Sequence, residues 1–408
     1  MPRPDGLTDR LKAAWVTAPA SRAVMSALNA ARPGSARFVG GCVRNALRGA
    51  PSDDIDIATQ LTPEAVIAAL TAAGVRSIPT GIEHGTVTAV HESVPVEITT
   101  LRRDVETDGR RAVVAFTEDW AEDAARRDFR LNAIYAGADG ELFEVIDQSV
   151  EDAIAGRVIF IGDGDQRLRE DYLRILRFYR FNAWYGAGID AEGQAACTRQ
   201  RDGLAKIASE RIWKELKRTL SAPDPSAAME AMEEAGVLEA VLPGAATSLL
   251  PGLVAAEADA GLAPDAMRRL MALVPRRLRE AGEVTARLRF SNEESARLTG
   301  WADPALPHVL GAGEAAMLEA FYRFGPAAAL DRAAIEAASG RAGSLAQVHK
   351  AATGWQRPKF PLGGNDALAA GLSGPEIGAR LGVLEEDWIA SGFSLPRATL
   401  LGRLKATG

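Results

Sequence analysis

Two aspartates, Asp54 and Asp56, are separated by a single isoleucine. The alternation of polar and apolar residues over 54–57 predicts a half-buried strand, in which both carboxylates point to the same face. Carboxylates this close repel each other unless a cation lies between them, and Mg²⁺ is the hard cation that prefers oxygen ligands. The pair is therefore a candidate site for two Mg²⁺ ions that stabilise the attacking and leaving oxygens of an in-line displacement. A solvated strand edge is the alternative for the pair taken alone.

A glycine pair, Gly40 and Gly41, precedes the aspartates by about 13 residues and is followed by a predicted helix over 42–47. Glycines let the backbone approach a phosphate closely, and the N-terminus of a helix presents free N–H groups. Arg44, on the same helix, adds a guanidinium fork that suits phosphate oxygens. We expect these three residues to cradle a triphosphate. A simple turn is the alternative for two glycines considered alone.

A third carboxylate, Glu97, lies between Val96 and Ile98. On such an apolar strand a charge is costly unless it is paired or bound to a metal. We expect Glu97 to complete or shape the metal site from a neighbouring strand. A salt bridge to a nearby arginine is the alternative.

The order of these features is more specific than any one of them. The segment resembles the polymerase-β-type nucleotidyltransferase fold, and specifically the family of class II CCA-adding enzymes and bacterial poly(A) polymerases. The resemblance covers about residues 36–220, and a short phrase at 361–368 is also similar. The matching segments are 38–45 (FVGGCVRN), 53–59 (DDIDIAT), 84–88 (HGTVT), 96–102 (VEITTLR), 108–111 (DGRR), 126–133 (RRDFRLNA), 170–177 (EDYLRILR) and 209–216 (SERIWKEL).

The resemblance implies roles for the residues around 126–133. Arg127 and Asp128 would position the ribose of the incoming nucleotide, and Asn132 would contribute to nucleotide binding. It also implies a flexible loop at 108–111. In the head the chain departs from the family pattern at three places: Asn45 stands where the family has Asp, Arg130 where Thr is common, and Gln148-Ser149 where a Pro and a Gly pair are usual.

Asp171, Arg174 and Arg177 are spaced i, i+3, i+6 on a helix predicted over 166–184, which places them on one side of it. An Asp can accept from the exocyclic amine of cytosine or adenine while an Arg donates to the adjacent ring nitrogen. Uracil and guanine present the reverse order, and each buried group left unpaired costs roughly 1–3 kcal/mol. The resemblance implies this base recognition for Asp171 and Arg174. An ordinary ion pair on a solvated helix is the alternative.

The elements that must position these residues change character along the chain. Short strands are predicted over 36–39 and 54–57, a hairpin over 85–90 and 94–99, and a helix over 62–73 with Thr62 as its N-cap. Residues 102–112 are polar and are predicted to be mobile. Helices are predicted over 8–31 and 208–220, and almost throughout 227–405 apart from a break over 356–364.

The fold class predicted is therefore α+β, with a polymerase-β-like head containing a mixed sheet, followed by an all-α neck, body and tail. The predicted division is an N-terminal helix (1–35), the head (36–148), a neck for base recognition (149–220) and an RNA-binding body and tail (221–408).

Composition excludes several classes of protein. The chain has 408 residues and a net charge of −7, which argues against a protein that simply coats nucleic acid but allows a local basic groove. Its two cysteines form no CxxC motif, its four histidines no zinc signature, and no run approaches the ~20 apolar residues of a membrane span. A reducing, cytoplasmic location follows as an expectation.

We therefore expect a template-independent RNA nucleotidyltransferase that adds CCA to the 3′ end of tRNA from CTP and ATP, with Mg²⁺ as cofactor and pyrophosphate as product. The alternatives are a poly(A) polymerase, a partial enzyme that adds only CC or only A, a small-molecule nucleotidyltransferase, and a non-catalytic RNA-binding module on the same scaffold. No membrane or protein partner is expected.

Overall fold

The computed structural model describes residues 10–52, 54–108 and 111–405. The contacts between residues divide the chain into two compact units. The first contains Met1–Glu215 and Ala227–Val241, and the second contains Leu216–Ser226 and Leu242–Gly408. The finer four-part division expected from the sequence stays a prediction.

The first unit is built on a seven-stranded sheet. Among its described strands only β2 and β5 pair in parallel, so the sheet is mixed, as predicted. In spatial order the strands are β3 (Arg76–Gly81), β4 (Thr86–His91), β5 (Val94–Thr100), β2 (Asp56–Thr59), β1 (Ala36–Val39), β8 (Ile134–Ala136) and β9 (Leu142–Glu144).

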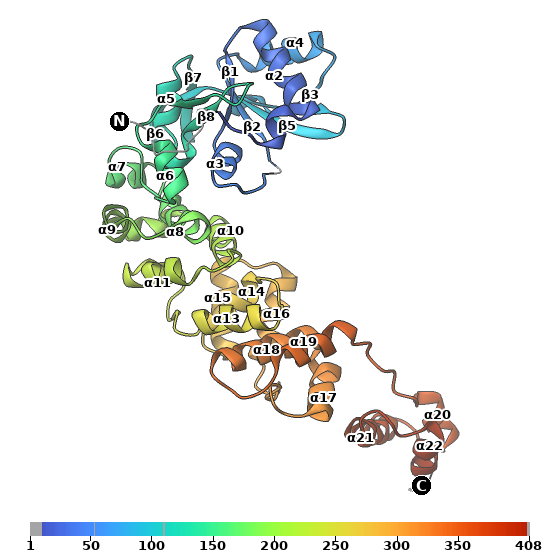
Figure 1. The fold of residues 1–408 in the computed structure, drawn as a ribbon. Coiled ribbons are helices and arrows are strands. Elements are labelled where there is room, and N and C mark those ends of the chain that lie inside the picture. The colour runs from blue at the N-terminus through green and yellow to red at the C-terminus, as the bar shows by residue number, and fades with distance from the viewer. Residues whose placement is uncertain (1–9, 53, 109–110, 406–408) are drawn as a thin grey trace. The chain divides into compact units, whose positions relative to one another are not determined.

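Two helices, α2 (Pro19–Ala31) and α4 (Pro63–Ala72), pack against strands β3, β4 and β5 (Figure 1). Pro63 opens α4, and the Thr62 hydroxyl accepts from the Ala65 N–H at 3.4 Å, so the predicted cap is confirmed. The predicted hairpin between β4 and β5 is also confirmed. One face of this part of the sheet is therefore covered by helices, and the strands present alternate residues to the other face.

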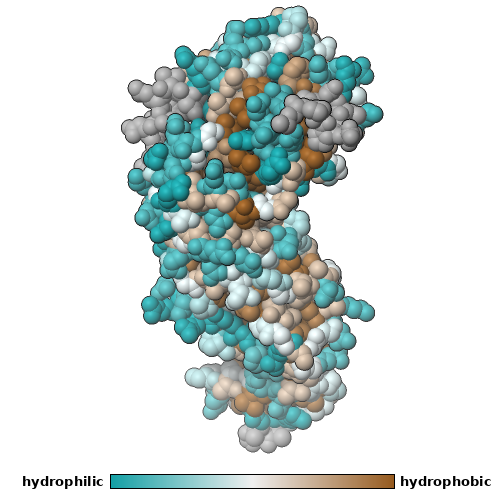
Figure 2. All heavy atoms as spheres, turned by 60° about the vertical axis from the view of Figure 1, so that its left-hand side comes forward, coloured by the Kyte–Doolittle hydropathy of each residue, from teal (hydrophilic) through white to brown (hydrophobic). Residues whose placement is uncertain are grey.

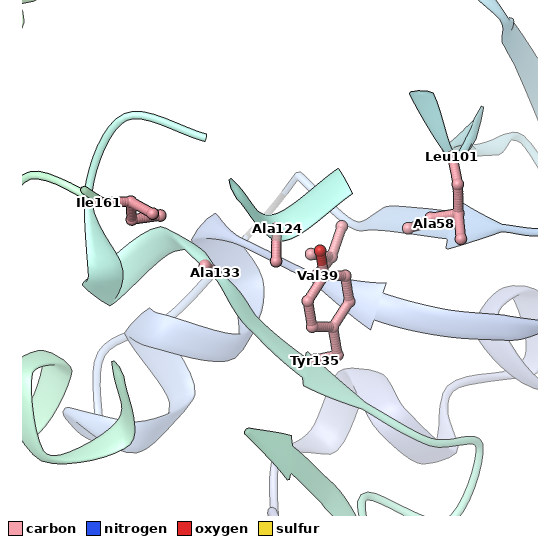
Figure 3. Packing of buried hydrophobic residues seen from close by; sticks show 7 residues of the cluster. All are labelled: Val39, Ala58, Leu101, Ala124, Ala133, Tyr135 and Ile161. Carbon is pink, nitrogen blue, oxygen red and sulfur yellow. The ribbon is translucent and has the colours of Figure 1, made fainter. Parts of the chain in front are cut away.

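A hydrophobic cluster lies where β1, β2 and β8 meet α5 (Trp120–Ala125). Figure 3 shows Tyr135 of β8 beside Val39, the last residue of β1, with Ala124 of α5 close by. Because Val39 is buried in this cluster, the backbone that follows it, at Gly40, starts from a fixed position. The cluster consists of Val39, Ala58, Leu101, Ala124, Ala133, Tyr135 and Ile161.

The helix predicted over 8–31 is wrong in its first half. The structure has a short helix α1 (Ala14–Thr17) and a separate α2, which begins at Pro19. Proline suits the first position of a helix because it lacks an N–H, and for the same reason it interrupts a helix interior. Arg10 instead pairs in an isolated β-bridge with Glu141.

The described backbone of the polar segment 102–112 is mostly strand, and the mobility predicted for this segment stays a prediction. β6 (Arg102–Asp108) and β7 (Arg111–Phe116) form an antiparallel two-stranded sheet. β6 is polar, but its backbone forms hydrogen bonds with β7. β7 is mostly apolar and lies largely beyond residue 112, and this pairing stabilises β6 as a strand despite its polar composition. The centre of the expected flexible loop, Gly109 and Arg110, lies outside the described residues.

The helix predicted over 166–184 is broken. α7 (Gly164–Glu170) ends at Asp171, whose φ of −151° and ψ of 105° are extended, and α8 (Leu173–Tyr185) starts after Tyr172. The Asp171 carboxylate accepts from the Leu173 N–H at 3.0 Å. An aspartate whose carboxylate accepts a hydrogen bond from a backbone N–H two residues later is typical of the start of a helix. Asp171 therefore favours a new helix start at this point over one continuous helix.

The other helices of this half of the chain are short. They are α3 (Gly41–Leu47), α6 (Ser149–Ala155), α9 (Ala191–Gln200), α10 (Ser209–Leu220), α11 (Ser226–Glu234), α12 (Val237–Val241) and the 3-10 helices η1 (Ile82–His84), η2 (Arg130–Asn132) and η3 (Arg201–Lys206). The helix predicted over 208–220 is confirmed as α10.

The second unit is helical in all its regular elements within the described residues. α18 packs against α13, α14, α16, α17 and α19. Residues 355–363, all described, form neither helix nor strand, which confirms the predicted break. The helices are α13 (Leu250–Asp259), α14 (Ala266–Leu273), α15 (Leu278–Leu288), α16 (Asn292–Ala302), α17 (Glu314–Phe324), α18 (Pro326–Ala338), α19 (Leu345–Gly354), α20 (Gly364–Ala369), α21 (Pro375–Ala390) and α22 (Arg397–Lys405).

Figure 2 shows one face of the molecule, on which hydrophilic residues cover most of the surface and apolar residues gather in smaller patches. Among the described helices, none combines the length and the apolar character needed to cross a membrane.

Candidate active site

A pocket of about 480 Å³ in the first unit brings together residues from widely separated parts of the sequence. Every residue predicted for the site lines it except Asp54 and Glu97. The lining residues are Gly40, Gly41, Arg44, Asp56, Arg126, Arg127, Asp128, Asn132, Asp171, Leu173, Arg174, Arg177, Phe181 and Arg211.

The charge of this pocket is strongly positive on balance. Six arginines and three aspartates line it. A guanidinium group can bind two phosphate oxygens at once, and a concave pocket strengthens the positive electrostatic potential of the arginines that line it. The pocket therefore suits a polyanion of the size of a nucleoside triphosphate.

The glycine pair makes a sharp turn between β1 and α3. Gly40 has φ 71° and ψ −121°, a conformation that favours glycine, and its N–H donates to the Ile134 carbonyl at 3.3 Å. The Cys42 thiol donates to the carbonyls of Val39 (3.4 Å) and Asp56 (3.9 Å). Burial raises the pKa of this thiol to about 11, so it stays protonated and acts as a donor. The turn and the start of β2 are thereby tied together.

Arg44 is buried and held from several sides. Its Nη1 donates to Asn132 Oδ1 at 2.5 Å, and its Nε and Nη2 donate to Asn45 Oδ1 at 3.2 and 3.0 Å. Its guanidinium lies 3.8 Å from the centre of the Tyr185 ring. Asn45, which departs from the family pattern, thus supplies a neutral acceptor that orients Arg44.

Asp56 lies at the centre of an acidic cluster. It is the first residue of β2, and its Cα is paired in register with that of Glu97 on β5. Burial, together with the negative charges of Glu97 and Asp54, raises the pKa of Asp56 to about 6, although the positive charge of Arg127 partly opposes the rise. Negative charge is therefore crowded here.

The expectation that Asp54 and Asp56 share one strand is wrong. β2 begins at Asp56, and Asp54 is exposed in the segment before it. The alternation over 54–57 predicts a strand that starts two residues too early, because pairing with β5 begins at Asp56, opposite Glu97. Asp54 still lies close enough to affect the pKa of Asp56.

The expectation that the charge of Glu97 is costly on an apolar strand is also wrong. Glu97 is exposed, so its charge bears no burial cost, while its neighbours Val96 and Ile98 are buried on the other face of β5. Tertiary packing of α2 and α4 decides which face is covered. Glu97 acts on the cluster through its charge on Asp56.

The donor set fits a divalent cation that is shared with a substrate. Among the described residues, no three His, Cys, Asp or Glu side chains are grouped closely enough to hold an ion by themselves. Mg²⁺ commonly takes only one or two carboxylates and completes its shell with water and substrate phosphates. A cation beside Asp56 would relieve the repulsion that raises the pKa of this carboxyl.

The residues expected around the ribose form a buried network. Arg127 Nη2 donates to Asp123 Oδ2 at 3.0 Å. Asp128 accepts from Arg177 Nε at 2.8 Å and from Asn132 Nδ2 at 3.0 Å. Burial by itself would raise the pKa of Asp128, but the charge of Arg177 and the bond from Asn132 outweigh it, so the pKa is lowered. Asp128 is thus ionised and links the head to α8.

Asp171 and Arg174 both line the pocket but are not paired with each other in the contacts observed. Asp171 Oδ2 accepts from Arg211 Nη2 at 3.0 Å, and Arg174 Nη1 donates to Glu170 Oε2 at 2.5 Å. The expected common helix face is wrong because α7 ends at Glu170 and α8 starts only at Leu173, so Asp171 lies in the break and Arg174 in α8. The two residues still line the same pocket, together with Arg177.

Four residues line the pocket without having been predicted from the sequence: Arg126, Leu173, Phe181 and Arg211. Arg211 lies within the segment 209–216, which resembles the family. Its position in that segment and its positive charge could therefore have marked it as a candidate site residue. Phe181 follows Arg177 by four residues, one helical turn along α8. The departures Arg130 and Gln148 contact each other, with Nη1 to Oε1 at 3.0 Å.

Two family models match the chain. The "Poly A polymerase head domain" matches residues 36–158, and the "Probable RNA and SrmB-binding site of polymerase A" matches residues 188–249.

Solved structures share the fold. The CCA-adding enzyme of Bacillus stearothermophilus in complex with CTP superposes with a TM-score of 0.71 at 23% identity, covering 95% of this chain and 96% of that one. The Thermotoga maritima CCA-adding enzyme complexed with tRNA_CCA gives a TM-score of 0.67 at 17% identity, covering 95% and 94%.

Relatives in sequence are more informative about the family. The CCA-adding enzyme of Leuconostoc citreum is 39% identical over 211 residues, about half of each chain (51% and 51%). The mouse protein named CCA tRNA nucleotidyltransferase 1, mitochondrial, is 34% identical over 396 residues, covering 91% of this chain and 86% of its own length. With similarity at this level along nearly the whole chain, this protein belongs to the CCA tRNA nucleotidyltransferase family.

Proposed function

We propose that this protein adds C, C and A to the 3′ end of tRNA from CTP and ATP, without a template and with release of pyrophosphate. The observation that carries the proposal is one pocket that brings Asp56 together with six arginines and with Asp171. The relatives named above act on tRNA by name, and two of the similar structures hold CTP and tRNA_CCA. These names favour CCA addition over poly(A) synthesis.

The metal site is assigned to Asp54 and Asp56, with Glu97 shaping its field. Activity in this family depends on a divalent metal ion, and we propose Mg²⁺. Bound there, it would neutralise the triphosphate and lower the pKa of the attacking 3′-hydroxyl. Gly40 and Gly41 leave room for the phosphates, and Arg44, already oriented by Asn45 and Asn132, binds their oxygens.

Base selection is assigned to Asp171 and Arg174. Each carboxylate oxygen of Asp171 is bonded once in the contacts observed, to Leu173 N–H or to Arg211, so acceptor capacity is left for an exocyclic amine. Arg174 donates to a ring nitrogen once it exchanges its bond to Glu170. Arg127, Asp128 and Asn132 position the sugar, and Arg177 holds Asp128.

The helical regions beyond the head are assigned to RNA. We propose that residues 149–220 serve as the neck beside the base, and that residues 221–408 contact the body of the tRNA. Residues 166–218 contain 12 Lys and Arg against 7 Asp and Glu, a local excess that suits phosphates. The two cysteines are buried and unpaired, which fits a reducing compartment, and we propose the cytoplasm.

An extension assay tests the function. Purified protein receives tRNA transcripts that end before CCA, after C or after CC, with labelled CTP or ATP and Mg²⁺. The double variant Asp54→Ala/Asp56→Ala removes the assigned carboxylates, and Glu64→Ala, an exposed acidic residue at the start of α4, is the matched control.

We expect addition that stops at CCA in the wild type and in Glu64→Ala and is lost in the double variant. Long A-tails on any RNA would indicate a poly(A) polymerase. Addition of A only after CC, or of C alone, would indicate a partial enzyme. No incorporation by the wild type would favour a binding module.

A further inference from the structure

The break between α7 and α8 controls where Asp171 lies. Tyr172, the next residue, has φ −62° and ψ −15° and is the N-cap residue of α8. The Arg174 N–H donates to the Asp171 carbonyl at 3.0 Å, and the Ile175 N–H to the Tyr172 carbonyl at 3.1 Å. Any shift of Tyr172 therefore moves Asp171 and the first turn of α8 together.

The ring of Tyr172 rests directly on Gly203 of η3. A Cβ added at Gly203 would lie 2.0, 2.2 and 2.4 Å from Cδ1, Cε1 and Cγ of that ring. Such distances do not occur between real atoms, and Cγ is too near the Tyr172 backbone to swing away freely. Gly203 is absent from the glycines with positive φ, so space, and not backbone conformation, excludes a side chain here.

The segment that carries Gly203 is itself anchored. Gly203 and Leu204 are buried, and the Ile207 N–H donates to the Leu204 carbonyl at 3.0 Å. Lys206, from the same segment, places its Nζ 5.3 Å from the centre of the Tyr172 ring. The ring is thus held at two points by one short, fixed element.

We propose that Gly203, through the ring of Tyr172, positions Asp171 for base selection. Gly203 is a positioning residue, since the pocket lining does not include it. This inference rests on the proposed function, because it assigns Asp171 to the base. Recognition of a base edge requires geometry held to about 0.5 Å, so a displaced ring weakens selection between bases more than it weakens phosphate binding.

A double-mutant cycle tests the coupling. The variants are Gly203→Ala, Tyr172→Ala and their combination, and Gly188→Ala is the matched control because a Cβ there would meet nothing within 4 Å. The measurement is kcat/KM for the first addition to tRNA lacking CCA, with CTP and separately with UTP. Thermal unfolding of each variant is recorded beside it.

We expect Gly203→Ala to lower the CTP/UTP ratio roughly tenfold, the scale of about one lost hydrogen bond. Tyr172→Ala should lower the ratio similarly, and the double variant should be no worse than Tyr172→Ala, because the clash disappears with the ring. Gly188→Ala should keep the wild-type ratio.

An unchanged ratio in folded Gly203→Ala, or additive effects in the double variant, would overturn the inference. If Gly203→Ala does not fold, Tyr172→Ala, which only removes atoms, decides the matter by the same ratio. A wild type that incorporates no CMP would refute the proposed function itself. A wild type that selects CTP while both single variants select it equally well would refute only the role of Gly203.

Discussion

At the scale of single residues, the site is organised by charges that are held in place before any ligand binds. Asp128 is ionised between Arg177 and Asn132, and Arg44 is fixed by Asn45 and Asn132. Asp56 is the exception, because burial and its acidic neighbours raise its pKa to about 6. A triphosphate with its metal ion would suit this arrangement, because its phosphates would bind the preorganised arginines and its metal ion would stabilise the Asp56 carboxylate.

The raised pKa of Asp56 predicts that Asp56→Asn stabilises the metal-free protein. Since the pKa of about 6 in the folded protein exceeds the ordinary aspartate pKa of 3.8, folding favours the protonated form. The free energy of unfolding therefore falls as pH rises from about 4 to 6, and the penalty is complete at neutral pH. It should amount to about 1–2 kcal/mol after solvent screening.

Thermal unfolding in EDTA at pH 7.5 and at pH 4 checks this. Asp56→Asn should exceed the wild type at pH 7.5, the gap should narrow toward pH 4, and Mg²⁺ should raise the Tm of the wild type more than that of the variant. A variant less stable than the wild type at pH 7.5 would show that Asp56 is paired and not crowded.

Arg211 and Arg199 offer a matched pair of exposed arginines. Arg211 binds Asp171 at the pocket, and Arg199 binds Asp165 away from that pocket. Exposed ion pairs contribute about 0–1 kcal/mol to stability, so both alanine variants should fold normally. Arg211→Ala should lower kcat/KM for CTP and ATP roughly tenfold, and Arg199→Ala should leave it unchanged. Equal effects in the two variants would remove Arg211 from the site.

At the scale of elements, the positions of short turns and breaks decide what the site residues can reach. The glycine turn after β1 brings the Cys42 thiol of α3 to the Asp56 carbonyl at the start of β2, and the break after α7 lets Asp171 bind Arg211. The β6–β7 sheet joins the main sheet close to Gly85, where the ring of Phe116 occupies the space of a side chain. Each junction depends on a small residue or on a polar side chain that bonds the backbone.

Gly85→Ala should loosen the base of the β6–β7 sheet. Gly85 and Gly74 both have positive φ, 80° and 69°, so alanine strains the backbone at each by about 1–2 kcal/mol. Only at Gly85 would the new Cβ meet a neighbour, Phe116 Cε1 at 2.8 Å. Hydrogen exchange over 102–108 and 111–116 should therefore be faster in Gly85→Ala than in Gly74→Ala. Identical exchange would mean that the ring moves aside without consequence.

At the scale of the whole molecule, the chain combines two compact units. Both contain apolar clusters and buried charges, and in the second unit several charged side chains are buried together among the helices. Glu257 accepts from Arg268 at 3.0 Å and from Arg269 at 2.9 Å, and Arg268 also donates to Asp331 at 3.1 Å. Such groups are stable only when every member keeps a partner.

Glu257→Ala should destabilise the second unit by roughly 3–5 kcal/mol, because it leaves two buried arginines short of an acceptor. Glu283→Ala, which removes an exposed partner of Arg279, should change stability by about 0.5 kcal/mol or less. Calorimetry should show a lowered transition only in Glu257→Ala, while CTP binding at low temperature is retained. Loss of CTP binding together with folding would show that the two units unfold as one.

The type of fold and most residues of the site can be predicted from the sequence alone. Local patterns sufficed for the Thr62 cap, the β4–β5 hairpin and the helical second half, since capping, turns and alternation act over a few residues. The spacing of polar residues, with the family resemblance, identified the residues that line the pocket, apart from Arg126, Leu173, Phe181 and Arg211.

The conformation, burial and partners of those residues depend instead on tertiary packing. It ended α7 at Asp171, started β2 at Asp56 and left Glu97 exposed. It also supplied Arg211 to Asp171 from 40 residues away, and set the Tyr172 ring on Gly203. The physical reason is that burial, pairing and close contact depend on which distant element packs alongside, and no local periodicity records that partner.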